Sequence, residues 1–400
     1  MAEQFFENQP SSSEIESRME GFPSWLEIDL DRLSFNLESI RRFVGGVEVI
    51  PCVKTNAYGH GLVPVVAQLS SLGVNRVLVA KTWEAMQIRS AGLDCGVINM
   101  DPLFSRRHFE SAVSNDLTQS IFSEETARQL SQAAVGLGRD VRVFIKVDTG
   151  LGRVGVRYDK ACDLVQAASS MPRLGVDGIF STFSEAPSLD RIQLDRMHRI
   201  IQDLERRGLP VPIVSMASSN AICHFQESHL DAVRPGIMLL GVYPEEEDQK
   251  VGPELRQILT FKGRLELVKW IEAGESLTYS RRFVAQKRMK VGTVHAGYSD
   301  GYPRGLTNKG RVRVGESLKP VLGSVSVNHH VVDLDDTDVE VGDVVELIGR
   351  NSENSISSLA ALAGIMTYSL CVGLNPLTPR VYFRGKTAVA LSEPKLVEKS

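Results

Sequence analysis

The feature that most constrains the fold is an alternation of short apolar runs with longer amphipathic stretches between residues 48 and 234. The runs are rich in Val, Ile and Leu, as strands buried on both faces are. They lie at residues 48–53, 76–80, 96–100, 117–121, 141–147, 176–181, 212–216 and 232–234. The stretches between them, such as 123–137, 160–170 and 189–207, have helical length and spacing. Strand–helix units joined by short links predict parallel strands, and a closed (β/α)8 barrel is the simplest architecture. The rival is an open doubly wound sheet, which lacks support because no GxGxxG follows the first strand.

The pattern changes after an acidic link at residues 244–248. Short β-like runs separated by turn residues follow at 258–268, 288–295, 312–314, 321–327, 344–348 and 387–391, with a helical stretch at 355–363. We therefore expect a barrel domain over residues 22–250 and a mainly β C-terminal domain over 251–392. A first strand at about 24–30, free to pack with the C-terminal domain, precedes a helix at 31–43. Residues 1–21 are expected to be a flexible leader and 393–400 a tail.

Composition excludes several classes of function. The formal charge of −4 and the lack of Lys/Arg runs give no footprint for nucleic acid or a membrane surface. The polar first segment does not resemble a signal peptide, and no apolar run is long enough to span a bilayer. Five scattered cysteines without a CxxC pair indicate reduced thiols. These features predict a cytoplasmic protein that binds neither nucleic acid nor a membrane.

Lys54 stands where an apolar strand meets a polar, glycine-bearing turn. A lysine there is costly to bury unless it is paired, neutralised or covalently used, although it can also reach solvent. The string from residue 53 to 61, Val-Lys-Thr-Asn-Ala-Tyr-Gly-His-Gly, closely resembles the cofactor-lysine motif of alanine racemases. The resemblance covers about residues 24–389 and implies a pyridoxal 5'-phosphate (PLP) enzyme with a barrel and a β-domain. It also implies that Lys54 carries the cofactor and that Tyr58 binds its phosphate.

A second string, residues 233–241, resembles the racemase segment that holds the other end of the cofactor. The resemblance implies that Arg234 faces the pyridine nitrogen and that the backbone amides of Gly236 and Ile237 bind phosphate. Because arginine keeps its proton, the ring nitrogen facing it stays unprotonated, which weakens the electron sink and favours simple proton loss and return. Ser219, at a helix start after a strand, is similar to a further phosphate ligand; the alternative is a plain N-cap.

A third string, residues 296–304, resembles the family's second catalytic segment. A racemase needs a proton carrier on each face of Cα. By resemblance Lys54 serves the D face, and Tyr298, supplied by the partner subunit of a homodimer with shared sites, serves the L face. Tyr368 is similar to a tyrosine that contacts phosphate, and Tyr279 matches one with a supporting role.

Substrate recognition is implied at three positions. Arg153, in a glycine-bearing loop after a strand, resembles the arginine near the substrate carboxylate, and a guanidinium suits that task. An ion pair with Asp148 is its alternative role. Lys146 matches a lysine that is carbamylated in some members and positions that arginine. The backbone amide of Val327 is expected to bind the same carboxylate.

The chain departs from the family pattern at three places: Thr182 replaces a histidine, Asn328 follows Val327 where an acidic residue is usual, and Leu240 replaces a tyrosine. These changes leave serine or a larger amino acid open as the substrate, and also weak or absent turnover. His329 and His330 lack a third ligand at metal-site spacing, so we expect a turn and no metal.

The sequence thus predicts a PLP-dependent racemase that interconverts L- and D-alanine, a peptidoglycan precursor. One alternative is a decarboxylase of the same architecture, against which Arg234 argues because those enzymes pair a glutamate with the pyridine nitrogen. Another is a PLP-binding homologue without turnover.

Overall fold

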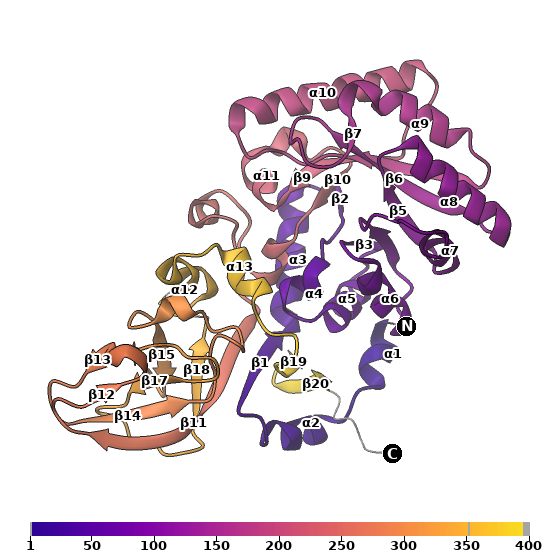
Figure 1. The fold of residues 1–400 in the computed structure, drawn as a ribbon. Coiled ribbons are helices and arrows are strands. Elements are labelled where there is room, and N and C mark those ends of the chain that lie inside the picture. Colours follow the sequence, from indigo (N-terminus) through magenta and orange to yellow (C-terminus); the bar gives the residue numbers. More distant parts are fainter. Residues whose placement is uncertain (1, 351–352, 395–400) are drawn as a thin grey trace.

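The computed structural model describes residues 2–350 and 353–394, and it places a barrel beside an elongated β-domain (Figure 1). Within that part of the chain, the barrel strands are β2 (Glu48–Val49), β3 (Arg76–Val79), β4 (Gly96–Asn99), β5 (Leu117–Ile121), β6 (Val141–Asp148), β8 (Leu174–Phe180), β9 (Ile213–Ser218) and β10 (Ala232–Arg234). Their ladders are parallel and follow chain order, β10 returns to β2, and a bridge between Cys52 and Leu78 closes the ring. The predicted (β/α)8 barrel is confirmed.

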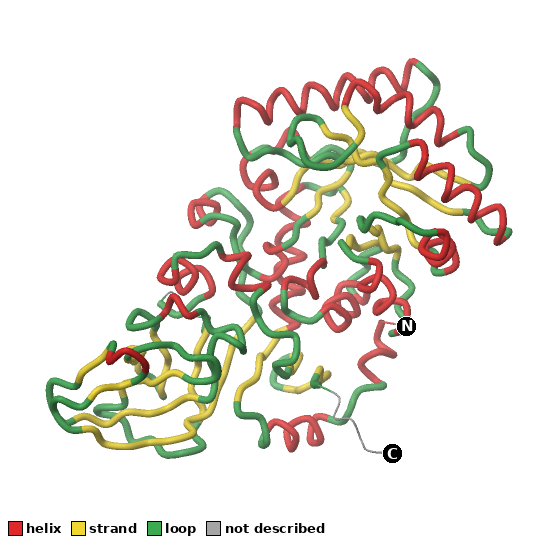
Figure 2. The backbone as a smooth tube through the Cα atoms, in the orientation of Figure 1, coloured by secondary structure: helices red, strands yellow, loops and turns green. Residues whose placement is uncertain are grey.

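Helices cover the outside of the barrel, as the red coils around the yellow strands in Figure 2 show. They are α3 (Leu30–Val44), α5 (Leu62–Ser71), α6 (Thr82–Ser90), α7 (Arg106–Ser114), α8 (Glu124–Leu137), α9 (Ala161–Ser169), α10 (Pro187–Arg206) and α11 (Ser219–His224). Several begin at a Ser or Asp whose side chain accepts a hydrogen bond from the first turn, as Asp29 does for α3 and Ser123 for α8. Such caps fix the residue at which each of these helices begins. Because the barrel strands are parallel, the strand-to-helix loops gather at one end of the barrel.

The C-terminal domain is built on the long strand β11 (Leu259–Ile271), which pairs with both β14 (Met289–Val294) and β18 (Val344–Ile348). In the described residues these pairings close a ring whose other members are β15 (Arg311–Val314), β16 (Ser317–Leu322) and β17 (His330–Asp333). Beside it, β1 (Ser24–Asp29) lies between β11 and β19 (Arg380–Arg384), and β20 (Thr387–Ser392) forms the edge. The mainly β prediction is confirmed. The remaining helices there are α12 (Ile356–Ala363) and α13 (Thr367–Val372).

Two expectations about local structure differ from the fold. The strand expected at 321–327 ends at Leu322, because Gly323 turns the chain at a φ of +75° and the Ser324 N–H binds the Thr278 hydroxyl. The leader expected over residues 1–21 is helical instead, forming α1 (Ala2–Glu7) and α2 (Ser12–Met19). Phe5 and Phe6 pack on the main core and Ile15 is fully buried, so apolar contacts hold this segment in place. Most of the expected tail, residues 395–400, lies outside the described residues.

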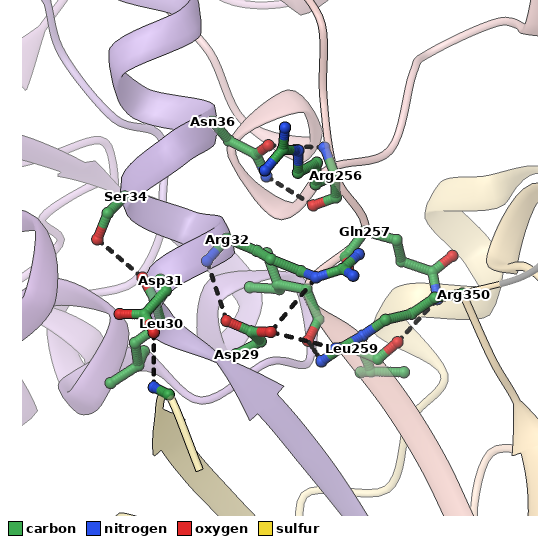
Figure 3. Close-up of polar contacts among 12 residues, drawn as sticks. Asp29, Leu30, Asp31, Arg32, Ser34, Asn36, Arg256, Gln257, Leu259 and Arg350 are labelled. Atoms are coloured by element: carbon green, nitrogen blue, oxygen red, sulfur yellow. Dashed lines mark hydrogen bonds and ion pairs between the residues drawn. The ribbon is translucent and has the colours of Figure 1, made fainter. Parts of the chain in front are cut away.

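The barrel and the β-domain meet along a polar seam at the start of α3 (Figure 3). Asp29 caps the Arg32 N–H and also pairs with the guanidinium of Arg350 at 3.1 Å. Deeper in, the fully buried Asn36 donates to the Arg256 carbonyl and accepts from the Arg256 N–H. Because buried amides and carboxylates are costly unless satisfied, these contacts fix how the two parts of the chain join.

No helix in the described part of the chain is long and apolar enough to cross a membrane.

Candidate active site

Lys54 begins the short turn α4 (Lys54–Tyr58), directly after the extended segment that continues β2. Residues 55–58 have φ values between +50° and +57°, so the chain makes a left-handed turn without a glycine. Such a conformation costs roughly 1–2 kcal/mol per residue. Strain of this kind persists only where the surroundings over-determine it, which marks this turn as a candidate functional element.

Glu84 on α6 is the main support of the left-handed turn. Its fully buried carboxylate accepts hydrogen bonds from the N–H groups of Asn56 (3.0 Å), Ala80 (3.1 Å) and Lys81 (3.1 Å). The Asn56 side chain in turn accepts from the Leu62 N–H at 2.8 Å. Sequence reasoning missed Glu84, since one acid in the first turn of a helix gives no signal of burial.

The C-terminal domain holds the far side of the same turn. The guanidinium of Arg380 donates to the Gly59 carbonyl at 2.9 Å, and the Tyr382 hydroxyl donates to the His60 carbonyl at 3.1 Å. A Cβ on Gly61 would lie 1.7 Å from the Tyr382 oxygen, so only glycine permits this approach. Lys54 is therefore positioned by both domains.

Arg234 ends β10 inside the barrel mouth and is 8% exposed. Its guanidinium donates to the Ser215 hydroxyl at 2.5 Å and to the Ser181 and Met216 carbonyls at 2.6 and 3.2 Å. Burial lowers the pKa of Arg234 to about 10, which leaves the side chain a cation at neutral pH. The guanidinium thus places a positive charge, fixed by neutral partners, in the wall of the cavity.

Four of the expected phosphate ligands converge beside it. The Ser219 hydroxyl accepts a hydrogen bond from the Gly236 N–H at 3.0 Å, and the Tyr58 and Tyr368 rings lie 6.0 Å apart between centroids. A Cβ on Gly236 would lie 2.5 Å from the Tyr58 hydroxyl, so the backbone is brought close to that tyrosine. We call these four residues the cradle. Ile237 follows Gly236 as the first residue of a 3-10 turn, Ile237–Leu240, and its side chain is fully buried.

Lys146 lies on β6 at 8% exposure, and its amine donates to the Thr182 hydroxyl at 2.6 Å. Burial, followed by the charges of Arg234 and Arg153, holds the pKa of Lys146 well below its usual range. Arg153 is exposed in the loop after β6, while Asp148 caps that loop by accepting from the Gly150 and Gly152 N–H groups.

These residues line one cavity of about 520 Å³ at the carboxyl ends of the barrel strands. Its walls hold Lys54, Lys146, Arg153, Thr182, Arg234 and the cradle. Cys52 and Glu185, which sequence reasoning did not single out, also line it. Desolvation raises the pKa of Glu185.

Three expected residues lie elsewhere. Tyr298 and Val327 do not line this cavity; their loops join through hydrogen bonds from the Tyr298 N–H to the Ser326 carbonyl (3.1 Å) and from the Ser299 N–H to the Val327 carbonyl (3.0 Å). Both side chains are more than two-fifths exposed. Leu240, which stands where the family pattern has a tyrosine, does not line the cavity either and is 2% exposed in the apolar core.

The protein is a closed parallel (β/α)8 barrel that carries a lysine, a buried arginine and the cradle at the carboxyl ends of its strands. These features place it in the class of barrel enzymes, whose active sites lie at that end. The chain matches the family model for the N-terminal domain of alanine racemase over residues 28–244 and that for the C-terminal domain over 258–382. It therefore belongs to the alanine racemase family.

Similar proteins span nearly the whole chain. An alanine racemase of Clostridium tetani is 32% identical over 92% of this chain and 97% of its own, and one of Halothermothrix orenii is 34% identical over 90% and 97%. Among solved structures, an alanine racemase of Clostridium difficile 630 superposes with a TM-score of 0.88 at 26% identity, covering 93% of this chain and 99% of that one. The Bacillus anthracis alanine racemase with bound L-Ala-P gives 0.84 at 27%, covering 93% and 98%.

Proposed function

We propose that the protein interconverts L- and D-alanine with PLP as cofactor. The observation that carries the proposal is one cavity whose walls hold Lys54, the cationic Arg234 and the cradle together. Two relatives named alanine racemase match this chain over 97% of their own length.

The residues present fit the cofactor. The cradle offers three hydroxyl groups and sits where only glycine at position 236 leaves room beside Tyr58. Backbone amides and hydroxyls of this kind suit a phosphate group. Arg234 would hold the ring nitrogen of the cofactor with its positive charge, and Lys54 would supply the amine for covalent attachment. When bound, PLP supplies an electron sink that makes the Cα hydrogen of an amino acid acidic.

The proton transfers are assigned to two side chains. The Lys54 amine takes or returns the proton at Cα on the D face, and the phenol of the partner subunit's Tyr298 does so on the L face. Exposure of Tyr298 outside the cavity of its own chain supports this arrangement, which requires a homodimer. Arg153 and the Val327 backbone amide hold the substrate carboxylate.

Lys146 is proposed as a carbamylation site. Carbon dioxide reacts with a neutral amine, and the lowered pKa of Lys146 favours that form. Thr182 accepts the uncarbamylated amine's hydrogen bond where the family has a histidine. Since Thr182 lines the cavity, serine remains the second candidate substrate. The five free thiols support a cytosolic location.

A panel of L-amino acids incubated with the PLP-loaded protein in D2O tests the proposal. We expect deuterium at Cα and inversion of configuration for L-alanine, with slower reaction of L-serine. Release of carbon dioxide would favour a decarboxylase, and absence of both exchange and inversion would leave only a PLP-binding protein.

A further inference from the structure

We propose that Glu266, His295 and His329 bind a divalent transition-metal ion of the zinc class on the β-domain. His295 Nδ1 and His329 Nε2 lie 3.0 and 2.9 Å from the same carboxylate oxygen of Glu266. The three donor atoms lie within 4.8 Å of one another, and none of these residues lines the cavity with Lys54. The proposal is therefore independent of the racemase assignment.

Strand register brings these three residues together. Strand β14 lies between β11 and β17 (Figure 1). Val294 on β14 is opposite Leu265 on one side and opposite His330 on the other. His295 follows Val294 and His329 precedes His330, so the antiparallel pairing of β14 with β17 brings the two histidines opposite each other. The β11–β14 register shifts between Leu265 and Leu267, so Glu266 occupies a bulge. A bulge re-aims the side chain of its extra residue, here toward the two imidazoles.

The donor set and its geometry fit zinc or a similar ion. Two imidazoles and one carboxylate, with a fourth position open to water, are a donor set that zinc uses. With metal–ligand distances of roughly 2.0–2.2 Å, tetrahedral donors stand about 3.4 Å apart. The two nitrogen–oxygen distances of 3.0 and 2.9 Å are close to that value, and all three donor atoms lie within 4.8 Å of one another. The two rings are already nearly perpendicular, at 77° and 4.8 Å between centroids. All three side chains retain at least 39% exposure, so water can complete the site and small rotations are free.

The carboxylate is ready to act as a ligand. The hydrogen bond from His295 lowers the pKa of Glu266, so this group is ionised at neutral pH. Each imidazole would bind through the nitrogen that now donates to Glu266, so its proton moves to the other ring nitrogen when the ion binds. The sequence places His329 beside His330 and predicts a turn without metal there. In the structure His330 is buried against Tyr302 and bonded to the Ala296 carbonyl, so it takes no part.

The proposed metal site lies close to the two loops that carry Tyr298 and Val327. His295 precedes Tyr298 by three residues, and His329 follows Val327 by two. An ion held by both histidines and by β11 ties together the two loops proposed to complete the partner's active site. Binding to the folded state alone raises stability by mass action.

Titration of tag-free, chelator-stripped holoprotein with ZnCl2 tests the proposal, with Co2+ absorption reporting coordination. We expect one ion per chain and a rise in melting temperature. His295→Ala and His329→Ala should each weaken binding by about tenfold or more. The double variant should abolish the rise in melting temperature.

Two further proteins make the test decisive. Glu266→Gln removes the anionic ligand while it keeps the side-chain shape, and it should also weaken binding. The control is His108→Ala/His198→Ala, which removes two exposed histidines on the barrel helices and should bind like the wild type. Absence of saturable binding near one ion per chain, or equal binding by the His295→Ala/His329→Ala variant, would overturn the proposal.

Discussion

At the scale of single residues, Arg234 does most to narrow the chemistry. It is buried, charged and bonded only to neutral acceptors, namely the Ser215 hydroxyl and two backbone carbonyls. A carboxylate at this position would instead favour a protonated ring nitrogen. The guanidinium is thus the residue-level reason to expect racemisation rather than transamination.

Substitutions of Arg234 should distinguish the effect of its positive charge from the effect of its paired N–H donors. Arg234→Lys keeps the cation but loses the paired donors, so we expect racemisation to fall by about 10- to 100-fold without new products. Arg234→Glu should raise the ratio of pyruvate formed to alanine racemised. Product analysis by chiral chromatography and a pyruvate assay measures both. Equal product ratios in the two variants would refute a role for the charge.

His330 should make stability depend on pH. Its Nδ1 donates to the Ala296 carbonyl at 2.7 Å, its Nε2 is buried without a partner, and burial lowers its pKa to about 4. Between that value and the unfolded value of about 6.5, only the unfolded chain takes up the proton. Stability is therefore complete above that range and falls as the pH drops through it.

We expect wild type to lose about 2 kcal/mol more than His330→Asn between pH 7 and pH 5, measured by urea unfolding. The asparagine keeps a donor for the Ala296 carbonyl but does not titrate. His198→Asn, at an exposed position, should follow the wild-type curve. Parallel curves for wild type and His330→Asn would contradict the assignment.

At the scale of elements, the left-handed turn α4 needs support from outside itself. The Glu84 carboxylate accepts hydrogen bonds from three backbone N–H groups in and beside the turn. A glutamine has only one acceptor oxygen, so its NH2 group would face one of these N–H groups. We expect Glu84→Gln to destabilise the protein by about 2–3 kcal/mol and to weaken PLP binding. Urea unfolding and PLP titration measure the two effects.

The matched control for Glu84 is Glu110→Gln on α7, where the carboxylate pairs with the exposed Arg106. That change should cost less than about 0.5 kcal/mol, because exposed ion pairs contribute little. Equal losses in the two variants would show that Glu84 does not hold the turn.

The elements also show what the sequence reveals. Buried parallel strands such as β6 give continuous apolar runs, so the barrel was predictable from periodicity. The short strands β17 and β19 and helix α13 were not expected, because elements of four to six residues give little periodic signal. Glu84 and the cluster of Glu266, His295 and His329 depend on pairing between segments far apart in sequence. Sequence motifs identified the residues that line the cavity. The residues that hold them in position, such as Glu84, become neighbours only when the chain folds.

At the scale of the whole molecule, the chain crosses repeatedly between its two parts. Strand β1 lies in the C-terminal sheet before the barrel begins, and Arg380 and Tyr382 on β19 return to hold the Lys54 turn. The domains are therefore coupled at the active site. Yet Tyr298 and Val327, on the β-domain, are exposed and do not line the cavity that Lys54 lines. We therefore infer that each chain supplies Lys54 to one site and Tyr298 to the other, and that the active unit is a dimer.

Subunit exchange between Lys54→Ala and Tyr298→Phe proteins tests this central claim most directly. Each variant alone should be nearly inactive. In a mixed dimer one site receives both substitutions and the other receives none, so random exchange should restore roughly one quarter of the wild-type racemase rate. The account predicts this recovery only after the subunits have exchanged. A mixture that exchanges subunits and remains inactive would contradict a site shared between two chains.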